Sequence, residues 1–504
     1  MVLAVGAAVG YAYYLSHDLR RVVVRGLHKQ LTIGHEAGTQ NILMVGSTSR
    51  CALAVQSTGF GLCDEGVNGV NSDVIMILHA DPAAHKLSLL SIPRDLFVPN
   101  ARSTGANKID ADLSQGISQV VASIPEDFGI SIQHAVSLNF DQFSNVVNAI
   151  GGINMSFPES VYDAESALNV QAAACVHLNG LQALQLVRAR HLQYKGDSTT
   201  PDAEYWPQEA ESDLARIDRD HEFLRILAAT VAARGIDNPV TDLELINSLK
   251  ADLTFDQSWS VTDMVDLVLD FHSVDINAVP QLTLPVTVVS DPEGSGGQLL
   301  YEGAEYGDVE FAAGAPDLAT IDQFLDVGPS IDTMTGEPLP AAGAVSVSVE
   351  NGSGQYNQAT DTADALSGLG FHVAGVGDVD ATGDLEETYV YYGSLDPTDE
   401  AAAETVAHSM TGSVVMAYDP SDVTDGAEVT VVTGSQFGFV TPASSTSGTS
   451  TTTTAPPASS NGGFTSPSAQ NIGTPSASVM ALAPWDPRAC AAGAVPTSPQ
   501  PNQT

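Results

Sequence analysis

The chain of 504 residues contains 61 acidic side chains but only 18 Lys and Arg, which gives a formal net charge of −43. This length allows two or three domains, each with its own core. The charge balance excludes the continuous basic face that phosphate backbones require, so nucleic acid is not an expected partner. A highly soluble secreted protein or a salt-adapted host accounts for most of the acidic excess.

The N-terminal residues predict an attachment to a membrane. Met1 to Leu15 is an almost unbroken apolar run, shorter than the roughly 20 residues of a spanning helix. It lacks the basic flank and the cleavage site of a signal peptide. We therefore expect 1–34 to hold a membrane anchor, truncated at its cytoplasmic end, and a juxtamembrane segment, with the rest of the chain outside the cell. The core of a signal peptide is the alternative.

Residues 35–326 alternate strand and helix patterns, which predicts an α/β fold, a three-layer sandwich with a mixed central sheet. Continuous apolar runs at 41–46, 74–79 and 87–92 are typical of strands that are covered on both faces. Further strands are expected at 153–157 and 281–289. Helices and amphipathic segments are expected at 140–150, 180–187, 213–234, 243–253 and 261–271.

The C-terminal part has a different composition. Residues 327–344 are rich in Pro, Gly and Thr and predict a linker. Strand and helix patterns return in 345–436 and predict a small α+β domain. Ser, Thr, Pro and Gly dominate 437–504, which predicts a disordered tail. A Trp and a Cys near its end, Trp485 and Cys490, would be odd in a purely solvated segment.

Four cysteines in an exported chain suit disulfides and allow three connectivities. We expect a Cys51–Cys63 disulfide that closes a short loop containing glycines. Cys175 and Cys490 are then left, and their pairing would dock the tail on the domain at 35–326.

The few cations are unevenly distributed along the chain. No Lys or Arg occurs between Ala251 and Pro487, whereas most of them fall between Lys86 and Arg234. A highly charged anionic ligand explains why this region keeps cations that the chain otherwise excludes. The alternative is that these side chains only offset neighbouring surface carboxylates such as Asp213, Asp218 and Asp220.

Arginines in this region occur at spacings that bring them together. Arg188 and Arg190 follow a predicted helix, and a two-residue spacing in extended chain puts both on one side. Arg216 and Arg219 are three residues apart on a predicted helix and share a face. Arg94 comes directly after a predicted buried strand. Guanidinium groups hold phosphate oxygens bidentately, so this pattern predicts a site for a phosphorylated ligand.

Five sequence strings occur in one order between residues 41 and 227, and together they resemble the LytR–CpsA–Psr family of cell-wall glycopolymer transferases. They are Asn71-Ser-Asp73, Lys86 with Ser91-Ile-Pro-Arg94-Asp95, Asn107-Lys-Ile-Asp110, Leu178 to His191, and Asp213 to Leu224. Residues 345–432, which contain Asn351-Gly-Ser-Gly near their start, resemble the small LytR_C-like domain that often follows this catalytic domain in actinobacteria.

The resemblance implies roles for particular residues. It places the pyrophosphate ligands at Lys86, Arg94, Arg188, Arg190 and Arg216, and we add the adjacent Arg219. It implies a magnesium ion beside Asp73. With Arg94, the carboxylates Asp73 and Asp95 are the candidate catalytic residues, and Asp95 acts in acid/base chemistry or orients Arg94. The family has an Asp where this chain has Thr48, so a metal ligand at that position is in doubt.

The expected activity is a magnesium-assisted phosphotransfer. By resemblance, the enzyme moves a glycopolymer from a polyprenyl-pyrophosphate carrier onto peptidoglycan and forms a phosphodiester. Its partners are then the lipid-linked glycan, peptidoglycan and the membrane, to which a single-pass anchor attaches the extracytoplasmic domain. Two alternatives are a pyrophosphatase of the same fold and a non-enzymatic wall-binding or regulatory protein.

Overall fold

The protein is described from a computed structural model. The residues it describes are 20–27, 39–47, 69–102, 105–171, 173–209, 212–234, 253–271, 273–288, 300–301, 304–306, 309–379, 385–440 and 482–497. The apolar run at the N-terminus, Thr48, the expected Cys51–Cys63 disulfide and most of segment 243–253 lie outside these ranges. Within them, no helix combines the length and the apolar character needed to cross a membrane.

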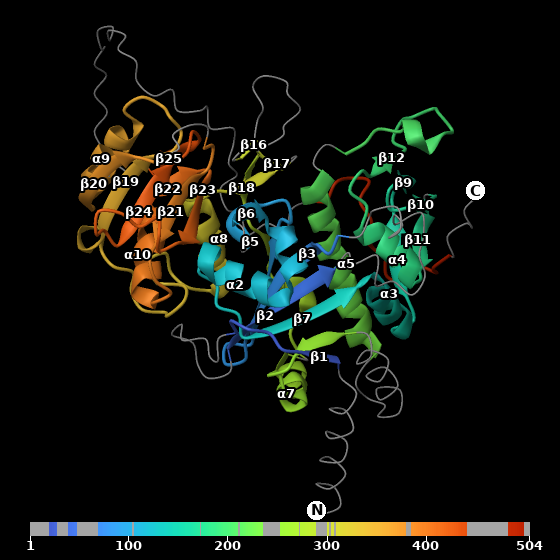
Figure 1. The fold of residues 1–504 in the computed structure, drawn as a ribbon. Helices are drawn as coiled ribbons and strands as arrows, with labels where there is room; N and C mark the ends of the chain where they lie inside the picture. The colour runs from blue at the N-terminus through green and yellow to red at the C-terminus, as the bar shows by residue number, and fades with distance from the viewer. Residues whose placement is uncertain are drawn as a thin grey trace, which may run out of the picture.

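A seven-stranded mixed sheet forms the centre of the first domain (Figure 1). Its strands, in spatial order, are β1 (Arg20–Val22), β13 (Thr254–Asp256), β7 (His134–Asn139), β2 (Gln40–Ser47), β3 (Ser72–Asp81), β4 (Lys86–Ile92) and β14 (Gln281–Thr283). Strands β2, β3 and β4 are antiparallel, whereas β7 runs parallel to β2 and β14 parallel to β4. Because β1 belongs to the sheet, the domain starts before residue 35, the boundary expected from the sequence.

Helices cover both faces of this sheet. Helices α2 (Ile117–Phe128) and α8 (Ala315–Leu325) lie on one side and α5 (Ser212–Arg234) on the other (Figure 1). Alternate residues of β3 serve the two layers, since Ile75 and Ile77 join the core that contains α2, while Met76 borders a small cavity together with Ile217 of α5. The predicted three-layer α/β sandwich with a mixed sheet is confirmed.

A smaller lobe lies beyond α5 and has its own apolar core. Helices α3 (Phe140–Ala149) and α4 (Gly180–Val187) pack beside the antiparallel strands β8 (Ile153–Phe157) and β11 (Ala173–Leu178). Each helix begins with a reciprocal capping box, from Asn139 with Gln142 and from Asn179 with Gln182. The lobe also contains β9 (Val161–Asp163), β10 (Leu168–Val170) and β12 (Gln193–Tyr194).

The remaining elements of the first domain connect these parts. They are β5 (Phe97–Arg102), β6 (Gly105–Lys108), α7 (Val261–Phe271), β15 (Val286–Val288), β16 (Leu300–Tyr301), β17 (Ala304–Glu305), β18 (Glu310–Ala312) and the short 3-10 helices η4 (Ile109–Gln115), η5 (Ala203–Tyr205) and η6 (Ile276–Ala278). The single strand expected at 281–289 is divided between β14 and β15, which join different sheets. Pro285 lies at the break, where it has no N–H for a ladder hydrogen bond.

The C-terminal domain is built on a five-stranded sheet with the order β20 (His372–Asp378), β19 (Ser346–Asn351), β24 (Val429–Thr433), β21 (Thr388–Tyr392) and β23 (Val414–Tyr418). Helices α9 (Gln358–Leu369) and α10 (Pro397–Ala407) pack on this sheet. Strands β22 (Met410–Gly412) and β25 (Phe437–Phe439) form a separate pair, and η7 (Ala342–Ala344) precedes β19. The predicted small α+β domain is thus confirmed.

The two domains are packed tightly against each other. One buried apolar cluster continues from Phe128 of α2 to Val415 of β23. The Tyr392 hydroxyl donates a hydrogen bond to the Glu126 carbonyl at 3.0 Å. Segment 327–344, which we expected to be a linker, takes part in this contact, since the buried Thr333 donates to the Gly129 carbonyl at 2.8 Å.

The end of the chain returns to the smaller lobe. Strand β26 (Arg488–Ala489) pairs with β8, and Cys490 forms a disulfide with Cys175 of β11. The Trp485 ring stacks on Tyr194 with ring centroids 3.8 Å apart. The predicted Cys175–Cys490 disulfide and the docking of the tail are therefore confirmed. Residues 482–497 depart from the disorder expected for 437–504, because the disulfide, the strand pair and the ring contact hold them.

A test of the contact between α3 and α4 uses Gly180. A β-carbon built at Gly180 lies 2.0 Å from the Ser144 carbonyl oxygen, so the two helices can approach only where the side chain is absent. We expect Gly180→Ala to lower the free energy of unfolding by about 1–3 kcal/mol, as overpacking does. Gly368→Ala is the matched control, because nothing lies within 4 Å of its β-carbon on α9.

The control substitution should stabilise the protein by about 0.5–1 kcal/mol, since alanine favours the helix more than glycine does. Chemical denaturation of the two variants measures both changes. An unchanged or raised stability for Gly180→Ala would contradict the close approach of α3 and α4.

Candidate functional site

One edge of the central sheet gathers charged side chains from separate parts of the sequence. Because β3 and β4 are antiparallel, Asp73 at the start of β3 lies near Arg94 and Asp95, which follow the end of β4. Arg190 comes from the segment after α4, and Arg216 from the first turns of α5. The sheet edge and two helices thus fix the positions of these groups.

Asp95 is the carboxylate at which the cations meet. Its two oxygens lie 3.4 Å from Arg94 Nε, 2.9 Å from Lys108 Nζ and 2.9 Å from Arg190 Nη2. Burial by itself raises the pKa of Asp95, but Arg94, Lys108 and Arg190 together hold that pKa below its usual value. Asp95 is therefore an anion that positions cations, and it is a poor proton acceptor.

Two further carboxylates close a ring of alternating charges. Asp213 lies 3.1 Å from Arg190 Nε and 3.1 Å from Arg216 Nη2. Arg216 donates to the Asp73 carbonyl at 3.0 Å, and the Asp73 carboxylate pairs with Arg94. We call this set the charge ring, and its members are Asp73, Arg94, Asp95, Arg190, Asp213 and Arg216.

Two buried carboxyl groups beside the charge ring have pKa values near neutrality. Burial raises the pKa of Asp110 to about 6, and the opposing effect of Arg94 is smaller. Burial also raises the pKa of Asp220 to about 7 against the effect of Arg216. Asp220 Oδ1 has no hydrogen-bond partner among the described residues, and Asp220 borders the same small cavity as Asp73.

Lys86 and Arg188, which the sequence predicted as pyrophosphate ligands, contact groups outside the charge ring. Lys86 begins β4, at the opposite end of the strand from Arg94, and its exposed ammonium pairs with Asp326. Arg188 places its guanidinium carbon 4.5 Å from the centroid of the Phe140 ring, a cation–π contact. Lys86 therefore lies away from Arg94, Arg190 and Arg216, which the charge ring brings together.

Arg219 belongs to a separate buried network. Its guanidinium contacts both Glu209 oxygens at 2.6 and 2.9 Å and donates to the Ala189 carbonyl at 2.6 Å. It also lies 3.3 Å from Asp486 in the returning C-terminal segment. These contacts tie the tail to the smaller lobe, so Arg219 stabilises the fold where the sequence suggested that it binds a ligand.

Lys108 is a cation of this site that the sequence analysis left out of the ligand set. The signal was present, since Lys108 lies in one of the five family-like strings, but the sequence did not show that the pairing of β5 with β6, which ends at Lys108, brings this side chain to Asp95. A hydrogen-bonded pair of Ser91 Oγ and His221 Nε2, 2.7 Å apart, was also not expected. Burial lowers the pKa of His221 to about 4, so this imidazole is neutral at pH 7.

Two protein-family models match parts of this chain. Residues 16–201 match the model of the LytR_cpsA_psr family, and residues 344–437 match LytR_C, the LytR cell envelope-related transcriptional attenuator. The chain therefore contains a LytR_cpsA_psr domain followed by a LytR_C domain. This confirms the resemblance that the five sequence strings indicated.

Individual relatives are cell-wall proteins by name. The chain is 31% identical over 297 residues to a probable cell wall biosynthesis protein, LcpB of Corynebacterium glutamicum. The matched region covers 58% of this chain and 64% of that protein. It is 32% identical over 136 residues to the Bacillus subtilis polyisoprenyl-teichoic acid–peptidoglycan teichoic acid transferase TagV. This matched region covers 25% of this chain and 34% of TagV. The match thus spans less than two thirds of either relative.

Among solved structures, a LytR-Csp2A-Psr enzyme from Actinomyces oris has a TM-score of 0.43 at 21% identity, over 56% of this chain and 90% of that chain. Bacillus subtilis TagV has a TM-score of 0.41 at 20% identity, over 58% of this chain and 98% of that chain.

The structural assignment of Arg219 can be tested by stability. We expect Arg219→Met to lower the free energy of unfolding by about 3–5 kcal/mol, because it leaves buried carboxylates of Glu209 and Asp486 without their cation. Arg225→Met is the matched control on the same helix, where a more exposed pair with Glu222 contributes about 1 kcal/mol or less. Urea denaturation measures both. Equal losses for the two variants would contradict the assignment.

Proposed function

We propose that this protein is a phosphotransferase that moves a glycopolymer from a polyprenyl-pyrophosphate carrier onto peptidoglycan. The observation that supports this most strongly is the charge ring, which gathers scarce cations at one sheet edge of a chain whose net charge is −43. The names of the relatives agree with it, since one is a cell wall biosynthesis protein and another a teichoic acid transferase.

In this proposal the pyrophosphate replaces carboxylates as the partner of the guanidinium groups. Arg94, Arg190 and Arg216 are already fixed in position, so they neutralise the phosphate oxygens with little reorganisation. Lys108 adds a fourth cation, and Asp95 keeps the group together as a positioning residue. Arg188, whose guanidinium lies over the Phe140 ring, is proposed to contact the carrier.

The reaction exchanges one oxygen–phosphorus bond for another. A peptidoglycan hydroxyl oxygen forms a bond to the sugar-linked phosphorus, and the bond from that phosphorus to the bridging oxygen breaks. Polyprenyl phosphate leaves with the electron pair, and a phosphodiester joins the glycan to the wall. We assign the hydroxyl proton to Asp110, because this carboxyl group interacts with Arg94 and Asp73 of the charge ring, accepts a hydrogen bond from Asn71, and has a pKa that burial raises to about 6.

Magnesium is part of the same proposal. Asp73 and Asp220 border one cavity, and Asp220 Oδ1 has no hydrogen-bond partner within the described part of the chain, so two carboxylates are suited to a hard cation. When bound, magnesium would neutralise charge on the phosphate oxygens. Because Asp73 also pairs with Arg94, metal binding should depend on a pyrophosphate that takes over Arg94.

The proposal places the protein at the outer face of the membrane, where the lipid-linked glycan and peptidoglycan meet. A pyrophosphatase would transfer the same phosphoryl group to water, and a binding protein would hold the lipid without turnover. Incubating the protein with a polyprenyl-pyrophosphate glycan, with and without peptidoglycan, separates these functions. Mass spectrometry should find a glycan–peptidoglycan phosphodiester, and release of free glycan phosphate at the same rate without acceptor would favour the pyrophosphatase.

We expect Arg94→Ala and Arg190→Ala each to lower the transfer rate by about 10²–10³, the usual loss for one preorganised charge contact. Arg225→Ala is the control, because Arg225 pairs with Glu222 outside the charge ring and should leave the rate unchanged. Initial rates of phosphodiester formation measure the effect. Near-normal transfer by both charge-ring variants would show that this edge of the sheet is not the site.

Magnesium binding should be weak in the free protein and tighter in the presence of a polyprenyl-pyrophosphate analogue. Asp73→Asn should abolish this coupling and most of the activity, because it removes the carboxylate that magnesium and Arg94 share. Asp364→Asn, at an exposed position on α9, is the matched control. Calorimetric titration with magnesium measures both variants, and tight binding that persists in Asp73→Asn would place the metal elsewhere.

A further inference from the structure

Buried carboxylates collect where the two domains meet, in a part of the chain that contains no Lys or Arg to pair with them. No Lys or Arg occurs between residues 251 and 487. Asp322 of α8 is 5% exposed, and neither of its carboxylate oxygens has a hydrogen-bond partner among the described residues. A buried carboxylate without a partner costs free energy, so something outside the chain or a proton must compensate it.

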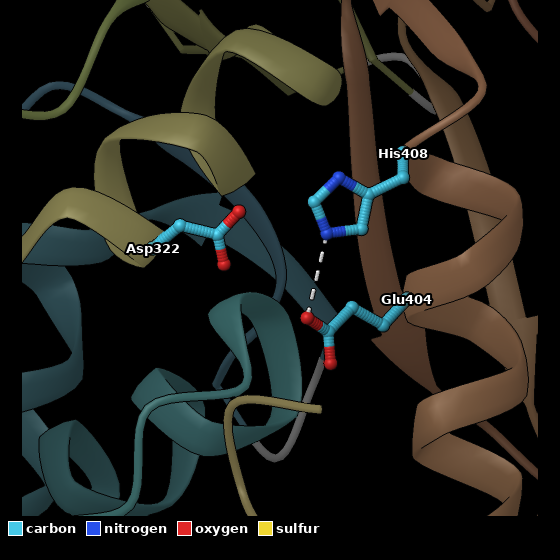
Figure 2. A group of neighbouring side chains, drawn as sticks. All are labelled: Asp322, Glu404 and His408. Atoms are coloured by element: carbon cyan, nitrogen blue, oxygen red, sulfur yellow. Dashed lines mark ion pairs between the residues drawn. The ribbon is translucent and has the colours of Figure 1, made fainter. Parts of the chain in front are cut away.

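Two side chains from the other domain face Asp322. Glu404 lies on α10 and is completely buried, and His408 follows one turn later, just after the helix ends. Figure 2 shows the Asp322 carboxylate pointing from α8 towards the His408 ring and the Glu404 carboxylate. One ligand atom from each of the three residues lies within 4.8 Å of the other two.

The contacts within this group do not satisfy its polar atoms. His408 Nε2 lies 3.5 Å from Glu404 Oε1, which is long for a hydrogen bond, and neither atom has a hydrogen-bond partner within the described ranges. The other Glu404 oxygen accepts from the Thr333 N–H at 3.3 Å, which orients the carboxylate. Three potential ligand atoms thus converge on one point, and the Thr333 N–H orients one of the three groups, the Glu404 carboxylate.

We propose that Asp322, Glu404 and His408 bind a zinc ion that fastens helix α8 of the first domain to helix α10 of the C-terminal domain. An imidazole nitrogen with two carboxylate oxygens is a zinc ligand set, and water would complete the tetrahedron. Zinc ligands about 2.0–2.2 Å from the ion lie about 3.3–3.6 Å apart. Small side-chain rotations bring atoms that are now up to 4.8 Å apart to that spacing.

The chemistry of the group favours zinc over magnesium and over a proton. Magnesium seldom binds imidazole, whereas zinc binds it readily. Protonation would neutralise Asp322, whose pKa burial raises to about 7, but it would leave the His408 Nε2 without an acceptor or ligand bond. A neighbouring group of Asp332, Glu400 and Glu404 has no imidazole, and both Asp332 oxygens already accept hydrogen bonds.

This site is independent of the proposed transferase reaction, and metal binding tests it directly. The full chain, freed of metal with a chelator and dialysed, is titrated with zinc chloride in a calorimeter. We expect one saturable site per chain, with affinity lowered at least about 100-fold in Asp322→Asn and in His408→Gln. The matched controls are Asp364→Asn and His372→Gln, which change exposed residues of the same C-terminal domain and should bind as the unmodified chain does.

Thermal unfolding gives a second readout that separates a metal site from a structural contact. Without metal, Asp322→Asn should raise the melting temperature, because it removes an unpaired buried charge. With zinc, the unmodified chain should gain stability and the variant should not, so the order of the two reverses. Either the absence of saturable zinc binding or unchanged affinity in both site variants would overturn the proposal, and so would a variant that is more stable in both conditions.

Discussion

Asp95 is the point on which the candidate site depends, because one carboxylate holds cations from three separate segments. Arg94, Lys108 and Arg190 would repel one another at this spacing if the carboxylate were absent. Their mutual anion keeps them close together in the protein without ligand. In the proposed function, phosphate oxygens would replace the carboxylates of Asp73 and Asp213 as partners of the arginines, so ligand binding would be an exchange of anions on a fixed frame.

The scarcity of cations shapes the rest of the molecule as well. In the first domain, some buried carboxylates have arginine partners, as the contact of Glu209 with Arg219 illustrates, whereas burial raises the pKa of Asp127 well above the usual carboxyl range. In the C-terminal domain and at its boundary there is no Lys or Arg in the sequence, and burial raises the pKa of Glu387 and Asp317 well above the usual carboxyl range. Ion pairs with arginine thus balance part of the acidic excess around the candidate site, and no such arginine is supplied by residues 251–487.

Local sequence patterns predicted most elements of the fold. They failed where contacts between distant parts of the sequence determine the structure. The strand Ile153–Phe157 and the helix Gly180–Val187 were predicted to the residue, because apolar periodicity and an Asn cap mark them. Helix α8 was not predicted, although Pro316 lies at its start, since its apolar face is matched to a partner from the other domain. Local sequence patterns also did not predict that the C-terminal domain packs tightly against the first domain.

The prediction of the site was incomplete for a related reason. Family-like strings located Arg94, Arg190 and Arg216 in one place, but they could not show which end of a strand a side chain occupies, and Lys86 lies at the far end of β4. Helix α5 is covered on more than one side, so Arg216 and Arg219 contact different partners in spite of their three-residue spacing. Spacing along a helix predicts which side chains share a face. The partners of those side chains are known only from the packed structure.

The disulfide between Cys175 and Cys490 spans 315 residues of sequence, and this encloses the whole LytR_C domain in a covalent loop. A protease that cuts a single peptide bond anywhere inside that loop leaves both fragments joined through sulfur. In an oxidising environment the LytR_C domain therefore cannot be released by one cleavage within the loop. Release would require reduction or a second cut, and electrophoresis of nicked protein would show one band until a reductant is added.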